Sequence, residues 1–129
     1  FFNAEVVICD KRRKRANEIE SMSIIGDVTG QDIVLIDDII DTAGTLSKAA
    51  ALIMENGANS VRAVCTHAVL SGKAYETIEN SALSELLVTD TIPLKRQSDK
   101  IKVLSTADLF AKAIASVNEH GSISELFKI

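Results

Sequence analysis

Residues 34–45 read VLIDDIIDTAGT, and this stretch decides the fold of the chain. The apolar run at 34–36 predicts a buried strand, and Asp37 and Asp38 are expected to emerge at the rim where that strand ends. A turn of small residues follows and leads into a helix that Thr45 is expected to cap. The stretch therefore predicts a strand, a turn and a helix, with acidic side chains at the join.

The rest of the chain alternates between the same two regular elements. Apolar residues at helical spacing indicate helices, and short β-branched runs indicate strands. This alternation predicts an α/β fold, with a mostly parallel sheet flanked by helices on both faces, in one domain spanning residues 1–129. The expected helices are Thr45–Asn56, Gly72–Asn80 and Thr106–Asn118, and the expected strands are Glu5–Cys9, Asp32–Ile36, Val61–Thr66, Glu85–Val88 and Lys102–Leu104.

Composition limits the classes of function. With 129 residues, 47% of them hydrophobic, the chain can bury a sizeable core. A net charge of −4 argues against nucleic acid as a partner, and no apolar run approaches the ~20 residues that span a membrane. Cys9 and Cys65 stand alone inside apolar runs, which is typical of reduced core thiols in an intracellular protein. We expect a cytoplasmic protein.

The turn at residues 41–45 has the features of an anion site. Ligands of parallel sheets bind beyond the carboxyl ends of the strands, where this turn is placed. The first N–H groups of the following helix would point outward, with the positive end of the helix dipole behind them. Ala43 and Gly44 are small enough to let a phosphate approach the backbone, and the hydroxyls of Thr42 and Thr45 add donors.

The aspartates indicate that the ligand carries a second kind of group beside the anion. Asp37, Asp38 and Asp41 are crowded, and neighbouring carboxylates repel by about 1 kcal/mol even in solvated surroundings. Such a cluster favours a ligand that carboxylate oxygens can bind. This could be a sugar diol, which donates hydrogen bonds to them, or a divalent metal ion, which they coordinate. A phosphorylated sugar would satisfy both halves, while an acidic rim beside a capped helix remains the alternative.

The stretch resembles the phosphoribosyl-pyrophosphate signature of type I phosphoribosyltransferases and of their relative, ribose-phosphate pyrophosphokinase. The rest of the chain resembles the pyrophosphokinase in order and spacing, over essentially its whole length. The departures are Lys14, where many members have Pro, and the two residues 128–129 after the usual final Phe. The matching segments are Cys9–Arg13 with Asn17, Ile25–Val28, Cys65–His67 with Ser71 and Gly72, Asp90–Leu94 and Ser122–Phe127.

The resemblance implies transfer of the β,γ-diphosphoryl group of ATP to the C1 hydroxyl of ribose 5-phosphate, with Mg²⁺, giving phosphoribosyl pyrophosphate and AMP. Lys11 and Arg13 match catalytic residues on a mobile loop, where lysine and arginine can neutralise developing charge. The ribose 5-phosphate site that it implies comprises Arg13, Asp37, Asp38, Asp41, Thr42, Ala43, Gly44 and Thr45. We also expect residues 10–29 to be largely mobile without nucleotide.

The resemblance further implies a preceding N-terminal half that holds most ATP and metal ligands. No metal ligand is therefore assigned in this chain, His67 is expected to be structural, and the chain alone is expected to be inactive. Ser122 and Ser124 match positions that contact the regulatory phosphate or ADP at subunit contacts of a hexamer, which implies a homo-oligomer. Paired serines are also common at the end of a domain.

Other functions remain open at this point. A nucleobase phosphoribosyltransferase would keep VLIDDIIDTAGT, although the basic run at 11–15 and the Ser-Ile-Ser tail argue against it. A non-catalytic regulatory homologue would keep the fold, although Lys11 and Arg13 are intact. A two-component receiver domain has paired acids too, but it would need a Lys-Pro pair that this sequence lacks. The basic run could also be a plain solvated loop.

Overall fold

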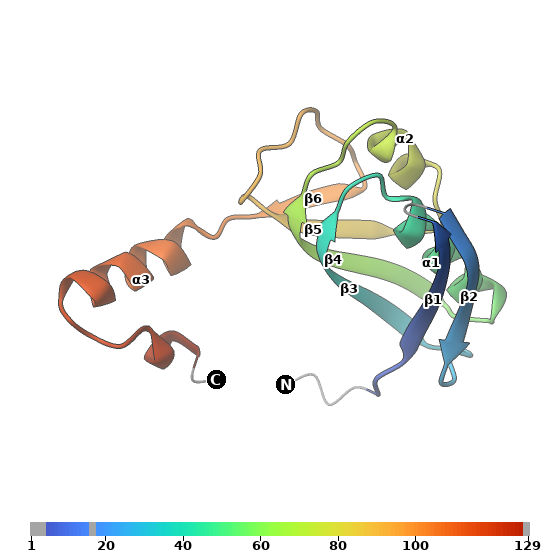
Figure 1. Cartoon of the computed structure of the whole chain (residues 1–129), viewed down its shortest axis with the longest axis horizontal. Helices are drawn as coiled ribbons and strands as arrows, with labels where there is room; N and C mark the ends of the chain where they lie inside the picture. The colour runs from blue at the N-terminus through green and yellow to red at the C-terminus, as the bar shows by residue number, and fades with distance from the viewer. Residues whose placement is uncertain (1–4, 16–17, 128–129) are drawn as a thin grey trace.

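A four-stranded parallel sheet forms the centre of the molecule (Figure 1). The computed structural model describes residues 5–15 and 18–127, without the side chains of 11–21 and 127. The strand order is β3-β4-β5-β6, and each neighbouring pair is parallel. This arrangement confirms the predicted α/β fold with a mostly parallel sheet. The strands are β3 (Asp32–Ile40), β4 (Ser60–Ala68), β5 (Glu85–Thr89) and β6 (Ile101–Leu104).

Two helices cover one face of this sheet. Helix α1 (Gly44–Glu55) follows β3 and packs on β4, and the shorter α2 (Ala74–Glu79) follows β4 and contacts α1. Both helices lie where the sequence predicts them, because their apolar residues recur at helical spacing. Their inward side chains join those of the sheet in one core, which includes Leu46, Ala50, Ile53, Ile78, Val61, Cys65, Leu86 and Val88.

The opposite face of the sheet is exposed, which corrects the prediction of helices on both faces. Val34 and Ile36, expected to be buried, are 54% and 77% exposed. They lie on β3, which is an edge strand, and no described helix packs over them. Helix α3 (Ala107–Asn118) has no buried residue and extends away from the sheet, together with the short 3-10 helix η1 (Ile123–Phe127) (Figure 1). None of the described helices is long and apolar enough to cross a membrane.

The N-terminal segment forms a separate antiparallel ribbon. Strand β1 (Ile8–Arg15) pairs with β2 (Glu18–Ile25), so the predicted strand at 5–9 does not belong to the central sheet. Most of residues 10–29, expected to be mobile, has regular backbone pairing. The physical reason is that the backbone of β2 pairs with that of the basic run, and the side chain of Ile24 in β2 packs against the core.

Candidate functional site

The first two aspartates lie inside β3, not at its end. The strand continues to Ile40, four residues beyond the predicted end. Side chains alternate between the two faces of a strand, so the adjacent Asp37 and Asp38 leave from opposite faces of the sheet. Asp37 is half-buried and opposite Cys65 in register, whereas Asp38 is exposed. The rim of the sheet therefore begins at Asp41, and the three acids do not form one cluster there.

The turn after β3 brings the backbone into α1 through a left-handed residue. Ala43 has φ 60° and is only 4% exposed. For a residue with a side chain this conformation costs roughly 1–2 kcal/mol, and strain of this kind concentrates at functional turns. Ala43 occupies the N-cap position without a side-chain hydrogen bond to the helix. Thr45, predicted as the cap, is instead the second residue of α1, so that prediction was wrong.

The start of α1 leaves backbone donors available. The first backbone hydrogen bond of the helix runs from the N–H of Ser47 to the carbonyl of Ala43, at 2.9 Å. The N–H groups of residues 44–46 precede it, and the geometry of a helix gives such groups no carbonyl within the helix. A Cβ built on Gly44 would meet only the Thr42 hydroxyl, at 3.9 Å. The space on the Cβ side of Gly44 is therefore open.

A second loop holds the turn in place from the end of β4. The N–H of Leu70 donates to the carbonyl of Ile40 at 3.2 Å, and that of Ser71 donates to the carbonyl of Asp41 at 3.0 Å. The Ser71 hydroxyl also donates to Asp41 Oδ1. Sequence reasoning did not assign Ser71, although it follows the strand parallel to β3, and the carboxyl ends of parallel strands meet at one edge.

His67 and Cys65 on β4 have structural surroundings. His67 Nδ1 lies 3.0 Å from the hydroxyl of Thr91, which donates to the carbonyl of Thr66. This contact fits the structural role expected for the histidine. Cys65 is buried, and burial raises the pKa of its thiol, which agrees with the predicted core thiol. Cys9 on β1 is half-buried.

The remaining predicted residues lie in segments outside the central sheet. Ser122 directly precedes η1 and Ser124 lies within it, both are exposed, and the Ser122 hydroxyl accepts a hydrogen bond from the N–H of Ser124 at 3.2 Å. Lys11 and Arg13 belong to β1, but their side chains lie outside those that the structure describes. Among the described residues, no group of three or more His, Cys, Asp or Glu side chains is placed to hold a metal ion.

Comparisons with known proteins agree on one family. The model of the phosphoribosyl synthetase-associated domain matches residues 6–128. Ribose-phosphate pyrophosphokinase of Campylobacter jejuni is 58% identical over 123 residues, covering 95% of this chain and 40% of that protein. Ribose-phosphate pyrophosphokinase 1 of Lactococcus lactis is 54% identical over 131 residues, covering 100% of this chain and 40% of that protein.

A solved structure shares the fold. The crystal structure of phosphoribosylpyrophosphate synthetase from Mycobacterium smegmatis aligns with a TM-score of 0.76 at 39% identity. The alignment covers 78% of this chain and 35% of the other. The chain thus spans about 40% of the length of the curated relatives that it matches.

Proposed function

The chain belongs to the family of the phosphoribosyl synthetase-associated domain, and from this premise we propose that residues 1–129 are the ribose 5-phosphate-binding domain of a ribose-phosphate diphosphokinase. The enzyme transfers the diphosphoryl group of ATP to C1 of ribose 5-phosphate and releases phosphoribosyl pyrophosphate and AMP. The observation that carries the proposal is the open backbone at the start of α1, directly after the left-handed Ala43.

The geometry of the turn suggests a role for each of its groups. The 5-phosphate binds the N–H groups of residues 44–46, where the helix dipole favours an anion. The hydroxyls of Thr42 and Thr45 donate to the same phosphate. Asp41, held by Ser71, accepts from a ribose hydroxyl, and Asp38 accepts from a second hydroxyl on the exposed face. Asp37, half-buried on the other face, supports the strand end or a further hydroxyl.

The transfer step needs positive charge beside the phosphates. Lys11 and Arg13 of β1 supply it in this proposal, with Arg13 also binding ribose 5-phosphate. Mg²⁺ would screen the phosphates of ATP when it is bound. The described residues offer no cluster that would hold the ion by themselves, so no step is assigned to it here.

The proposal extends to the assembly in which the domain works. We assign it to a homo-oligomer of the cytoplasm, a hexamer, in which Ser122 and Ser124 contact a regulatory phosphate or ADP. Their exposure on a segment that extends away from the sheet supports a role at a contact between subunits.

Calorimetry and a product assay test the proposed function. Ribose 5-phosphate titrated into the chain is expected to bind in the millimolar range, because the phosphate site is present while the ATP contacts lie elsewhere. The chain alone should form no AMP from ATP and ribose 5-phosphate. Absence of heat at millimolar sugar phosphate would contradict the binding assignment, and AMP production would contradict the inactivity of the isolated chain.

A further inference from the structure

The open face of the central sheet carries an apolar patch. Ile36, Val64 and Leu87 are register partners across three neighbouring strands, so their side chains form one row on this face. An exposed patch of this kind with charged residues at its border marks an interaction site. The apolar members of this open-face patch are Val34, Ile36, Val64, Leu87 and Leu104, and the charged residues at its border are Arg62, Glu85 and Lys102.

Helix α3 carries an apolar stripe that suits such a face. It has 12 residues, as many as α1, which packs on the covered face of the sheet. The stripe recurs at helical spacing, which is typical of a helix with one buried side. None of its side chains is buried. The residues of this α3 stripe are Leu109, Phe110, Ala113, Ile114 and Val117.

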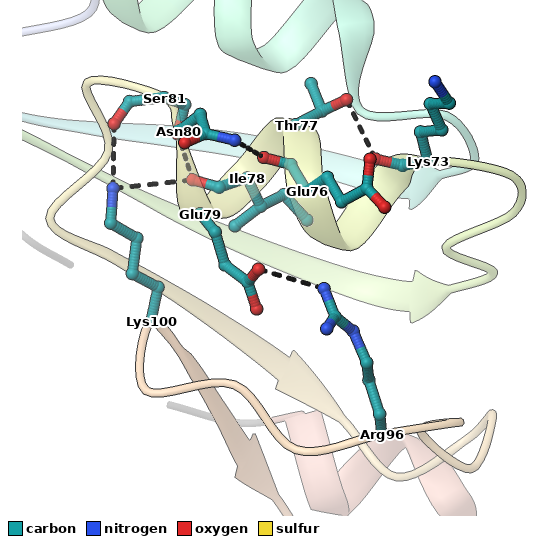
Figure 2. A network of polar contacts seen from close by, with 9 residues as sticks. All are labelled: Lys73, Glu76, Thr77, Ile78, Glu79, Asn80, Ser81, Arg96 and Lys100. Carbon is teal, nitrogen blue, oxygen red and sulfur yellow. Dashed lines mark hydrogen bonds and ion pairs between the residues drawn. The ribbon is translucent and has the colours of Figure 1, made fainter.

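The helices of the covered face cannot serve the open face. The apolar side chains of α1 and α2 belong to the core. Polar contacts also tie α2 to the segment before β6, as Figure 2 shows. Lys100 Nζ donates to the carbonyls of Ile78 and Ser81 at 3.5 and 2.8 Å, and Arg96 pairs with Glu79 at 2.9 Å. Of the described helices with an apolar stripe, α3 is therefore the one left to cover the open face.

The link before α3 directs this helix away from its own sheet. Only Ser105 and Thr106 separate β6 from α3. Asp90 accepts hydrogen bonds from both, at 2.5 Å from the Ser105 hydroxyl and at 2.8 and 2.7 Å from the N–H and hydroxyl of Thr106. Hydrogen bonds to a carboxylate are among the stronger ones in proteins. As held by Asp90, α3 points away from the sheet that precedes it (Figure 1).

We propose that α3 of one copy of this chain covers the open-face patch of a second copy, while the second copy's α3 covers the first. Such a reciprocal exchange has two-fold symmetry. In it, α3 runs opposite to the strands, as α1 does between the parallel β3 and β4. The negative end of the α3 dipole, with Glu119, then lies toward Arg62 and Lys102, which outnumber Glu85 at the border of the patch.

The surface that the exchange buries is large enough for a dimer. With 12 residues, α3 is about 18 Å long and about 10 Å wide, and it covers on the order of 400 Å² on each side of the contact. Two such contacts bury roughly 1,600 Å² in total, which is the size of a standard interface. Few large side chains take part, so we expect dissociation in the micromolar range. The dilute chain is then a monomer whose open face is free.

Sedimentation equilibrium measures this association. The chain is expected to pass from monomer to dimer between about 1 μM and 1 mM. Ile114→Glu in the α3 stripe and Ile36→Lys in the open-face patch should each weaken dimerisation more than about tenfold, because each places unpaired charges in an apolar contact. Both side chains are exposed in the single chain, at 69% and 77%. Both variants should therefore fold, and urea unfolding of the dilute proteins checks this.

A mixture of the two variants distinguishes the exchange from other dimers. The intact α3 of the Ile36→Lys variant can cover the intact face of the Ile114→Glu variant, so dimerisation should recover to within about tenfold of the unchanged chain. Ala115→Glu is the matched control, since it adds the same charge on the opposite side of α3 and should leave dimerisation unchanged.

Four results would overturn the proposal. They are a monomer at about 1 mM, a loss in only one of the two variants, no recovery in the mixture, and an equal loss in the Ala115→Glu control. A loss confined to Ile114→Glu would indicate helix against helix, and a loss confined to Ile36→Lys would indicate sheet against sheet. Binding of ribose 5-phosphate is measured separately and tests the proposed function alone.

Discussion

At the scale of single residues, Gly44 is a position where the fold does not require glycine but a bound ligand would. Its backbone does not require a positive φ, and a Cβ there would contact only the Thr42 hydroxyl at 3.9 Å. Glycine within a helix costs roughly 0.5–1 kcal/mol relative to alanine. The fold therefore gains nothing from glycine at this position, and close approach of a phosphate to the backbone gives it a purpose.

The variant Gly44→Ala tests this interpretation. Its free energy of unfolding should stay the same or rise by up to about 1 kcal/mol, since alanine favours the helix. Its affinity for ribose 5-phosphate should fall about tenfold, because the new methyl group occupies the space beside the N–H groups. Urea unfolding and calorimetry measure the two quantities. Unchanged affinity would mean that the phosphate does not approach residue 44.

Ser71 is the second informative residue, because its hydroxyl donates to Asp41 from a different loop. Ser71→Ala should weaken ribose 5-phosphate binding by roughly 3- to 10-fold, corresponding to one hydrogen bond. Ser60→Ala is a matched control, since the Ser60 hydroxyl makes the same kind of bond to Asp32 at the other end of β3, at 2.5 Å. Equal effects of the two variants on calorimetric affinity would show that only general stability has changed.

At the scale of elements, the sequence predicted α1 and the strand before it, but not where that strand ends. The apolar spacing of Leu46, Ala50 and Ile53 marks the helix because those side chains do pack in the core. Asp37 and Asp38 mark the predicted end of the strand, because carboxylates are rarely buried. The open face of this edge strand tolerates Asp38, and Asp37 is only half-buried on the other face. Nothing local in the sequence indicates that one face is open.

The ribbon of β1 and β2 was missed for a related reason. A run of basic residues at 11–15 indicates a solvated loop when it is read alone. Its strand character depends on pairing with residues 18–25, and such pairing is a tertiary property that strand propensity expresses only weakly. The left-handed Ala43 could not be predicted either, since alanine carries no preference for that conformation.

The link between β6 and α3 makes a prediction about pH. Asp90 accepts hydrogen bonds from the Ser105 hydroxyl at 2.5 Å and from the N–H and hydroxyl of Thr106 at 2.8 and 2.7 Å. These bonds lower the pKa of Asp90 from 3.8 to about 2. A depressed pKa means that the ionised form stabilises the folded link. The contribution of ionised Asp90 to the stability of the folded link is complete above pH 3.8 and is lost as the pH falls through about 2.

The amide of Thr106 reports this titration directly. Its chemical shift should follow a midpoint near pH 2, and in Asp90→Asn the transition should disappear because no proton is taken up. An acid titration followed by magnetic resonance measures both. A midpoint near the ordinary value for aspartate would show that the hydrogen bonds of Asp90 do not form in solution.

At the scale of the whole molecule, stability comes from one side of the sheet. Ile78 of α2 is fully buried, whereas Ile36 of β3 is 77% exposed on the open face. Ile78→Ala should lower the free energy of unfolding by about 2–5 kcal/mol, as for other large-to-small core changes. Ile36→Ala should change it by less than about 0.5 kcal/mol. Urea unfolding compares the two, and similar losses would mean that the open face is covered in solution.

The central claim is that the turn from Asp41 to Thr45, with the first N–H groups of α1, holds the phosphate of a sugar phosphate. The most direct measurement is a ribose 5-phosphate titration of the ¹⁵N-labelled chain, with ribose alone as the control for the sugar. The account predicts that the largest amide shifts fall on residues 42–46, saturate in the millimolar range and are absent with ribose. Shifts concentrated elsewhere, or no saturable shift at millimolar ribose 5-phosphate, would contradict it.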